Sequence, residues 1–173
     1  MQLQTMTRVM TCAAVMVVLG ASGWASAQSG ANTVLKPAEL QKLFPATVYY
    51  DGQSAPVQVR NSAGVKFTDG HYMLASLVDT SGYSSGLAAK YQGYLIAEVP
   101  LKIGGKLLPA GAYGFGFLGG GRFLVTDLGG HDVLTAQSVT DTAMSRPRPM
   151  QVTVDASRGF RLYAGRSYVH FSR

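Results

Sequence analysis

The sequence predicts an all-β fold, an antiparallel β-sandwich built from hairpins with one short N-terminal helix, and a closed β-barrel is the alternative. Turn signals recur between short runs in which apolar residues alternate with polar residues or glycine. Such spacing is typical of hairpins, because glycine permits the tight turns that join antiparallel strands. The turn signals are Asp51-Gly52, Asp69-Gly70, Gly104-Gly105, Gly119-Gly120-Gly121 and Gly129-Gly130.

The first 27 residues have the pattern of a secretory signal peptide. Arg8 precedes an apolar run from Val9 to Leu19, and Ala25-Ser26-Ala27 supplies the small residues of a cleavage site. The apolar run is too short for a permanent membrane span. We therefore expect cleavage after Ala27, a periplasmic or extracellular location and no stable membrane span.

Residues 28–173 are expected to form a single β-sandwich domain with an ordinary hydrophobic core. Cys12, the one cysteine of the chain, lies inside the predicted signal peptide. The mature chain would therefore be free of cysteine, which excludes disulfides and thiol chemistry.

One short helix is expected before the strands begin. Pro37 suits the first turn of a helix, Leu40, Leu43 and Phe44 fall on one face, and Pro45 prevents the helix from continuing. A further helical turn is possible over residues 86–91, between two of the expected strands.

Residues that pair across a hairpin share one face of the sheet, so each predicted turn also predicts which side chains face the core. A two-residue turn at 69–70 places Phe67 opposite Tyr72 and Val65 opposite Leu74. These four side chains are then expected to point inward.

A type II′ turn at Gly165-Arg166 sorts the last hairpin into an apolar inner face and a polar outer face. The inner pairs are Phe160 with Phe171 and Leu162 with Val169, and the outer pairs are Arg161 with His170 and Tyr163 with Tyr168. The three-glycine loop places four apolar side chains together, namely Phe115, Phe117, Phe123 and Val125. Gly114 and Gly116 on that first strand indicate the close approach of another segment.

Three runs of the chain resemble those of small secreted bacterial all-β proteins of unassigned function. They are LVDTSGYSSG from Leu77, LPAGAYGFGF from Leu108 and RLYAGRSYVHF from Arg161. The resemblance implies an all-β sandwich and brings no catalytic residue with it.

Positive charge is concentrated near the C-terminus. Residues 28–145 carry equal numbers of basic and acidic side chains, whereas residues 146–173 carry six arginines and one acid, Asp155. Arginine forms bidentate hydrogen bonds with carboxylate or phosphate, so these residues indicate a surface for an acidic polysaccharide or a phosphorylated lipid. The alternative is that they pair with acids elsewhere in the fold.

The predicted binding site is the outer face of the last hairpin, with Arg146, Arg148 and Arg158 near it. Tyrosine combines an apolar ring with a polar tip, which suits sugars and peptides, although this face could instead pack under a second sheet. The predicted site residues are Arg161, Tyr163, Arg166, Tyr168 and His170. We expect a non-catalytic module for a cell-envelope or extracellular ligand, such as an acidic glycan or other polyanion, with no cofactor and no nucleic-acid partner.

Two motifs suggest hydrolytic chemistry instead. The segment 82–86 matches G-x-S-x-G, in which Ser84 would be the nucleophile of a serine hydrolase and His131 or His170 its base. That motif belongs to parallel sheets with crossover helices, which the hairpin pattern does not favour. Asp79 begins a run close to the aspartic-protease motif, but Ser81 occupies the position of the required glycine, so an Asx-turn is the alternative.

Three further patterns concern cofactors and membranes. The segment 114–119 satisfies G-x-G-x-x-G, but a strand is expected after it where a nucleotide site needs a helix. His71, His131 and His170 could converge on a metal at the mouth of a sandwich or barrel, but they lack the close spacing of metal ligands, so surface positions are favoured and no metal site is predicted. A small outer-membrane β-barrel is an alternative function, although its strands need about nine to eleven alternating residues and most runs here are shorter.

Overall fold

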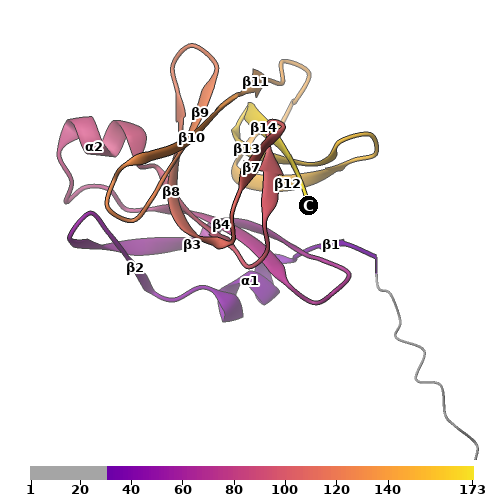
Figure 1. The fold of residues 1–173 in the computed structure, drawn as a ribbon, viewed down its shortest axis with the longest axis horizontal. Coiled ribbons are helices and arrows are strands. Elements are labelled where there is room, and N and C mark those ends of the chain that lie inside the picture. Colours follow the sequence, from indigo (N-terminus) through magenta and orange to yellow (C-terminus); the bar gives the residue numbers. More distant parts are fainter. Residues whose placement is uncertain (1–30) are drawn as a thin grey trace, which may run out of the picture.

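The computed structural model describes residues 31–173, and the predicted signal peptide lies outside these residues. The described chain is an all-β sandwich of two antiparallel sheets, with two short helices on its surface (Figure 1). The predicted fold class is therefore confirmed.

The first sheet contains eight strands, with β2 attached to β3 at one end of the path. In spatial order these strands are β1 (Thr33–Val34), β3 (Gln53–Lys66), β4 (Tyr72–Val78), β5 (Gly93–Ala97), β8 (Gly111–Leu118), β9 (Arg122–Thr126) and β10 (Asp132–Gln137), and the attached strand is β2 (Thr47–Tyr50).

The second sheet contains six strands, and β14 lies in its middle. In spatial order these strands are β12 (Arg148–Asp155), β13 (Gly159–Gly165), β14 (Ser167–Ser172), β6 (Leu101–Ile103) and β7 (Lys106–Leu108), and β11 (Val139–Thr140) also pairs with β14.

The sheets approach each other at their edges without closing into a barrel over residues 31–173, so the barrel alternative is wrong. At the edge formed by β7 and β10, the Lys106 Nζ donates a hydrogen bond to the Thr135 carbonyl oxygen at 2.6 Å. A side chain joins the two strands at this point, whereas a barrel needs a continuous backbone ladder.

The main core lies between the sheets and is rich in aromatic and branched aliphatic side chains. Full burial of one such side chain stabilises the fold by about 1.5–3 kcal/mol. Its most deeply buried large residues are Met73, Leu95, Leu101, Ile103, Leu108, Phe115, Phe123, Leu162 and Phe171.

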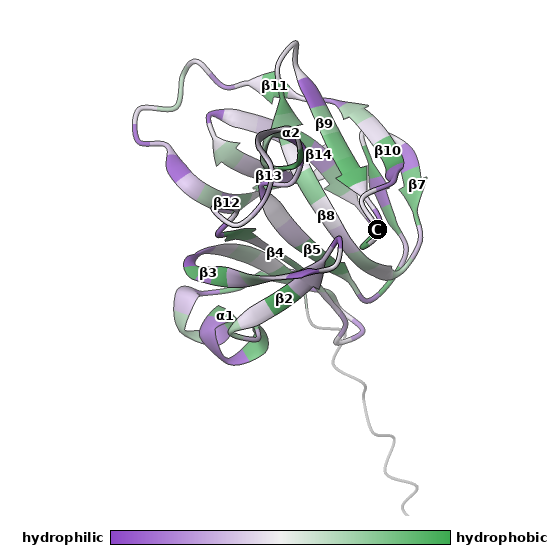
Figure 2. Cartoon of the chain, turned by 90° about the vertical axis from the view of Figure 1, so that its left-hand side faces the viewer, coloured by the Kyte–Doolittle hydropathy of each residue, from purple (hydrophilic) through white to green (hydrophobic). Residues whose placement is uncertain are grey.

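The predicted helix is present as α1 (Pro37–Leu43). Its first turn is stabilised by a hydrogen bond of 2.7 Å from the Lys36 backbone N to Glu39 Oε2. Leu40 is buried and packs with Phe44 and Leu74 on the outward side of β3 and β4. Figure 2 shows α1 and β2 on one side of these strands and β12 on the other. The first sheet is therefore covered on both sides in this region.

A second short helix, α2 (Ser85–Lys90), lies over β8 at one end of the molecule (Figure 1). It occupies nearly the residues for which a helical turn was considered. It packs on the outward side of β8, where Gly116 leaves room for the Lys90 backbone.

The hairpin between β3 and β4 differs by one residue from the predicted register. Its loop has three residues rather than two, because the Phe67 N donates a hydrogen bond to the His71 carbonyl oxygen at 2.8 Å. Val65 is consequently opposite Met73, which points into the core, while Leu74 points toward α1. A one-residue shift of this kind exchanges the two faces of a strand.

The other two predicted registers are confirmed. In the last hairpin Phe160 is opposite Phe171 and Tyr163 is opposite Tyr168, and the turn has positive φ at Gly165, as a type II′ turn requires. The three-glycine loop brings together the four predicted apolar residues, since β8 and β9 pair Phe115 with Val125 and Phe117 with Phe123.

Candidate functional site

The outer face of the second sheet is the side of β12, β13, β14 and β6 that points away from the core. The strand pairing arranges its side chains in rows that cross the strands. The first row is Gln151, Tyr163, Tyr168 and Val139, the second is Thr153, Arg161 and His170, and the third is Asp155, Gly159, Ser172 and Lys102. Three basic side chains and two tyrosines are thus gathered on one side of a rigid sheet.

Asp155, at the end of β12, is the main hydrogen-bond acceptor of the outer face. Its Oδ1 accepts from Ser157 N and Oγ and from Arg158 N at 2.8 to 3.0 Å. Its Oδ2 accepts from Nε and Nη2 of Arg161 at 2.8 and 2.6 Å. The bonds from Ser157, followed by those from Arg161 and Arg158, hold the pKa of Asp155 well below its ordinary value. Asp155 therefore stays ionised and compensates the charge of Arg161.

Arg161 also orders the aromatic residues of the outer face. Its guanidinium carbon lies 5.0 Å from the ring centroid of Tyr168, within the range of a cation–π contact. The Tyr168 ring lies 4.9 Å from Tyr163 and meets the His170 ring edge-on at 5.3 Å. Arg161 thus positions Tyr168, and its own charge is already paired.

Tyr163 is on the predicted side of the sheet but is only 2% exposed. Its hydroxyl donates a hydrogen bond to Asp141 Oδ2 at 3.1 Å, and the same segment supplies Met144, whose Sδ accepts from Gln151. The chain between β11 and β12 therefore covers this part of the outer face. The expectation that Tyr163 contacts a ligand does not fit this burial, whereas Tyr168 is only partly covered.

Arg166 lies exposed in the turn between β13 and β14, beyond the row that holds Tyr163 and Tyr168. Its carbonyl oxygen accepts a hydrogen bond from the Asp141 N at 2.9 Å. The backbone of Arg166 is thus tied to the covering segment, and its side chain is separate from the ion pair of Arg161.

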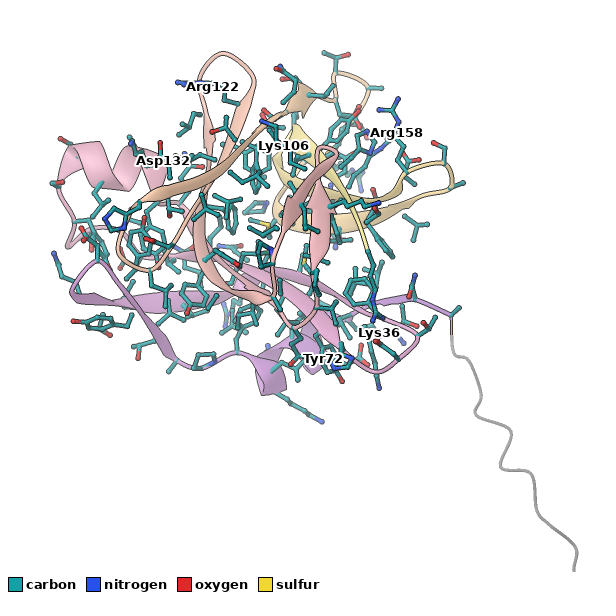
Figure 3. The ribbon with its side chains drawn as sticks, viewed as in Figure 1. Lys36, Tyr72, Lys106, Arg122, Asp132 and Arg158 are labelled. Carbon is teal, nitrogen blue, oxygen red and sulfur yellow. The ribbon has the colours of Figure 1, made fainter. Side chains whose placement is uncertain are left out.

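A pocket of about 470 Å³ opens beside His170, where β14 changes its neighbour. The first half of β14 pairs with β11 and the last two residues pair with β6, and between them the His170 carbonyl oxygen accepts from the Gly104 N at 2.9 Å. The polar lining comes from Lys102, Gln137, Arg158, His170 and Ser172, and among the described residues no carboxylate side chain lines the pocket. Arg158, labelled in Figure 3, belongs to the turn between β12 and β13 and is one of the lining residues.

His170 has an unusual environment at the wall of this pocket. Its Nδ1 is buried, has no hydrogen-bond partner within residues 31–173, and lies 3.8 Å from Asp155 Oδ2, which already accepts hydrogen bonds from Arg161. Burial first, and then the charges of Arg158 and Arg161, lower the pKa of His170, and Asp155 opposes this only in part. The imidazole is therefore neutral at pH 7.

Two of the six arginines in residues 146–173 pair with acids, as in the alternative explanation of the positive charge. Arg161 pairs with Asp155, and Arg173 pairs with Asp69 through Nη2 and Oδ2 at 2.5 Å. The hydrogen bond from Arg173 is the main reason that the pKa of Asp69 falls to about 2. Within residues 31–173, Lys102 and Arg158 form no ion pair, so the pocket holds the charges that a ligand could use.

The two hydrolase motifs have structural roles. Ser84 caps α2, its Oγ accepting from the Leu87 N at 3.4 Å, and among the described residues no histidine is bonded to it. Asp79 Oδ1 accepts from the Ser81 N at 3.0 Å, which is the Asx-turn considered above. The hydrogen bonds from Ser81 lower the pKa of Asp79. The antiparallel pairing of β4 with β5 also differs from the parallel sheet that a nucleophile elbow needs.

The three histidines lie apart, each near a different aspartate. The Nδ1 atoms of His71 and His131 are each 3.0 Å from an oxygen of Asp69 and Asp127 respectively, and His170 faces Asp155. Within residues 31–173 no three His, Cys, Asp or Glu side chains are grouped as metal ligands.

The glycine motif 114–119 runs along β8 into a turn followed by β9, so it does not open a helix. Gly114 faces the Tyr50 ring, and a Cβ placed there would lie 2.5 Å from Tyr50 Cε2. Gly116 lies against the Lys90 backbone. These glycines permit the close packing that the alternation indicated.

The sequence did not single out Lys102 or the neighbouring Gly104-Gly105 turn as part of a site. The only local signal was that Lys102 is opposite Leu107, which remains exposed. Lys102 joins His170 only because β6 pairs with β14, and these two strands are far apart in the sequence.

No helix in residues 31–173 is long and apolar enough to cross a bilayer. No protein-family model, no curated protein and no solved structure matches the chain. The function is therefore inferred from the chemistry of the outer face of the second sheet.

Proposed function

We propose that the protein is an exported, non-catalytic module that binds an acidic glycan on the outer face of its second sheet. The observation that carries this proposal is the pocket beside His170, whose charged side chains Lys102 and Arg158 have no acidic partner among the described residues. Two uncompensated cations at one concave site favour a ligand that brings negative charge.

The size and surroundings of the pocket support a sugar acid as the ligand. A volume of about 470 Å³ lies within the range of about 300–1,000 Å³ that is common for small-molecule sites. Tyr168 lies next to His170, and its ring is held in place by Arg161 and Tyr163. A fixed, partly exposed tyrosine offers a flat surface to a sugar ring, while Lys102 and Arg158 attract its carboxylate.

Export places the module where acidic polysaccharides occur. The predicted signal peptide supports this location, and it is tested by sequencing the N-terminus of the protein recovered from periplasmic and extracellular fractions. A mature chain beginning at Gln28 in either fraction is expected. An intact N-terminus on protein confined to the cytoplasm would contradict export.

The binding proposal is tested by titrating the mature chain with galacturonic acid oligomers in a calorimeter. The variant Lys102→Gln/Arg158→Gln is expected to lose at least about tenfold in affinity, because both cations that face the ligand are removed. The matched control is Lys42→Gln/Arg60→Gln, which removes the same charge from exposed positions on α1 and β3. Equal affinity of the two variants, or equal binding of neutral galactose oligomers, would overturn the proposal.

A further inference from the structure

His170 is the one basic group of the pocket whose charge depends on pH near neutrality. Lys102 and Arg158 supply the other two basic side chains of the pocket, whereas burial lowers the pKa of His170 and so disfavours its charged form in the unliganded pocket. The pocket therefore carries two positive charges at pH 7 and three once His170 is protonated.

The two ring nitrogens of His170 have different surroundings. Nδ1 is buried and faces Asp155 at 3.8 Å, too far for a hydrogen bond. Only Nδ1 of the ring is both buried and without a partner among the described residues, and the ring lines the pocket. Nε2 is thus the nitrogen that a ligand can reach.

The titratable and charged groups around His170 come from four strands and one turn, and the paired strand β11 (Val139–Thr140) adds none. Asp155 belongs to β12, Arg158 to the following turn, Arg161 to β13 and Lys102 to β6, and Tyr168 is the titratable neighbour on β14 itself. The single acid, Asp155, already accepts two hydrogen bonds from Arg161 through the oxygen that faces His170. Burial therefore opposes protonation of His170, and Asp155 offsets this only in part, until a ligand brings further negative charge.

We propose that a carboxylate bound in this pocket draws a proton onto His170 Nε2, so that the module binds its acidic ligand more tightly at mildly acidic pH. The proton comes from solvent and goes to the imidazole, and no covalent bond of the ligand changes. This inference rests on the proposed function and adds its regulation, because the same anion would be held by three cations at pH 5 and by two at pH 7.5.

The sign of the effect follows from linkage. An anion next to the ring favours its charged form, so binding raises the pKa of His170 and takes up protons. If this rise is one unit, affinity increases by up to about tenfold as the pH falls through the titration range of the free imidazole. The carboxylate of the ligand must itself stay ionised, which sets pH 5 as the lower end of the useful range.

The test measures affinity for a galacturonic acid trimer at pH 5.0, 6.0, 7.0 and 7.5 with the mature chain. Affinity is expected to rise several-fold toward pH 5.0, and calorimetry at pH 6.5 in two buffers of different ionisation enthalpy is expected to show proton uptake. In the variant His170→Gln both effects should disappear. The control His131→Gln removes an exposed imidazole beside Asp127 and should retain them.

The outcomes separate this inference from the proposed function. Absence of binding at every pH would refute the proposed function. Binding that is independent of pH, or pH dependence that persists in His170→Gln, would refute only the coupling to His170. Should His170→Gln fail to fold, NMR titration of the His170 ring in the unmodified chain decides the question, because saturating trimer must move its midpoint to higher pH; an unmoved midpoint contradicts the inference.

Discussion

The outward side of the first sheet and the outer face of the second sheet both carry tyrosines, but the first is covered and the second is partly open. The tyrosine cluster of the first sheet, defined as Tyr50, Tyr83, Tyr91 and Tyr94, is at most 9% exposed. On the second sheet Tyr163 is buried by the segment before β12, whereas Tyr168 remains partly exposed beside Arg161. The same residue type thus serves as core in one place and as surface in the other.

The difference follows from what lies opposite each ring. Tyr50 lies flat against Tyr91, with centroids 3.7 Å apart, and Gly114 leaves space beneath it. Its hydroxyl pairs with Thr126 Oγ1 at 2.7 Å, so burial leaves no unsatisfied donor on Tyr50. The outer face instead carries ionised groups around Tyr168, and charged groups resist being covered by an apolar layer. Glycine permits burial in the first case, and charge prevents it in the second.

The largest expected effect contrasts Tyr50→Ala with Tyr168→Ala. Tyr50 is fully buried, so its loss leaves a cavity and should reduce the free energy of unfolding by about 3–5 kcal/mol. Tyr168→Ala should cost about 1 kcal/mol, because its ring is only partly covered, but should weaken binding of galacturonic acid oligomers. Urea denaturation and calorimetry measure the two quantities. Similar destabilisation by both changes would break the distinction between the two faces.

The next prediction concerns the glycine that makes room for the cluster. Gly114→Ala would place a Cβ 2.5 Å from Tyr50 and 2.7 Å from Thr126 Oγ1, and such overpacking should cost about 1–3 kcal/mol of unfolding free energy. Gly119→Ala is the matched control, because no atom of the described residues lies within 4 Å of its added Cβ and its φ is not positive. The control should change stability by less than about 0.5 kcal/mol. Equal effects in urea denaturation would show that Gly114 is not needed for close packing.

The two hairpins at 165–166 and 69–70 differ in how well the sequence predicts their register. The last hairpin was predicted correctly because Gly165 determines a two-residue turn, and every pair from Phe160 to Phe171 follows from it. The hairpin at 69–70 was wrong by one residue because Asp-Gly also fits a three-residue loop, and the bond between Phe67 and His71 decides between the two. The alternation of apolar and polar residues therefore predicts which side chains face the core only when the length of the turn is predicted correctly.

The candidate site was predictable only where it depends on one hairpin. Arg161, Tyr168 and His170 share a face through local pairing, and this grouping was correct. Lys102 reaches them through the pairing of β6 with β14, and the burial of Tyr163 depends on Asp141 from the segment after β11. The alternation of apolar and polar residues within a strand does not indicate which distant strand lies beside it. The pocket and the covering segment could therefore not be predicted from the sequence.

A smaller effect on the free energy of unfolding is expected from replacing Asp155, the acid that pairs with Arg161. The pKa of Asp155 is lowered in the fold, so its ionised form stabilises the native state above its unfolded pKa of about 3.9, and this contribution is lost as the pH falls toward the lower native value. Asp155→Asn should therefore reduce the unfolding free energy at pH 7, and the gap to the unmodified chain should narrow below pH 4. Urea denaturation at pH 7 and pH 3 provides the comparison. A gap that does not depend on pH would mean that the charge of Asp155 contributes nothing.

The smallest effect separates the buried tyrosine of the outer face from the open one. Tyr163→Phe removes the hydrogen bond to Asp141 and keeps the ring against Tyr168, so it should lower the free energy of unfolding by about 0.5–1.5 kcal/mol. Affinity for galacturonic acid oligomers should stay unchanged, because the hydroxyl points into the covering segment and away from the ligand. Tyr168→Phe is the paired variant, and it should leave stability nearly unchanged because no hydrogen bond of the Tyr168 hydroxyl is lost among the described residues. Loss of affinity in Tyr163→Phe without loss in Tyr168→Phe would mean that the segment before β12 opens when ligand binds, and the division of this face into a covered and an open half would then be incorrect.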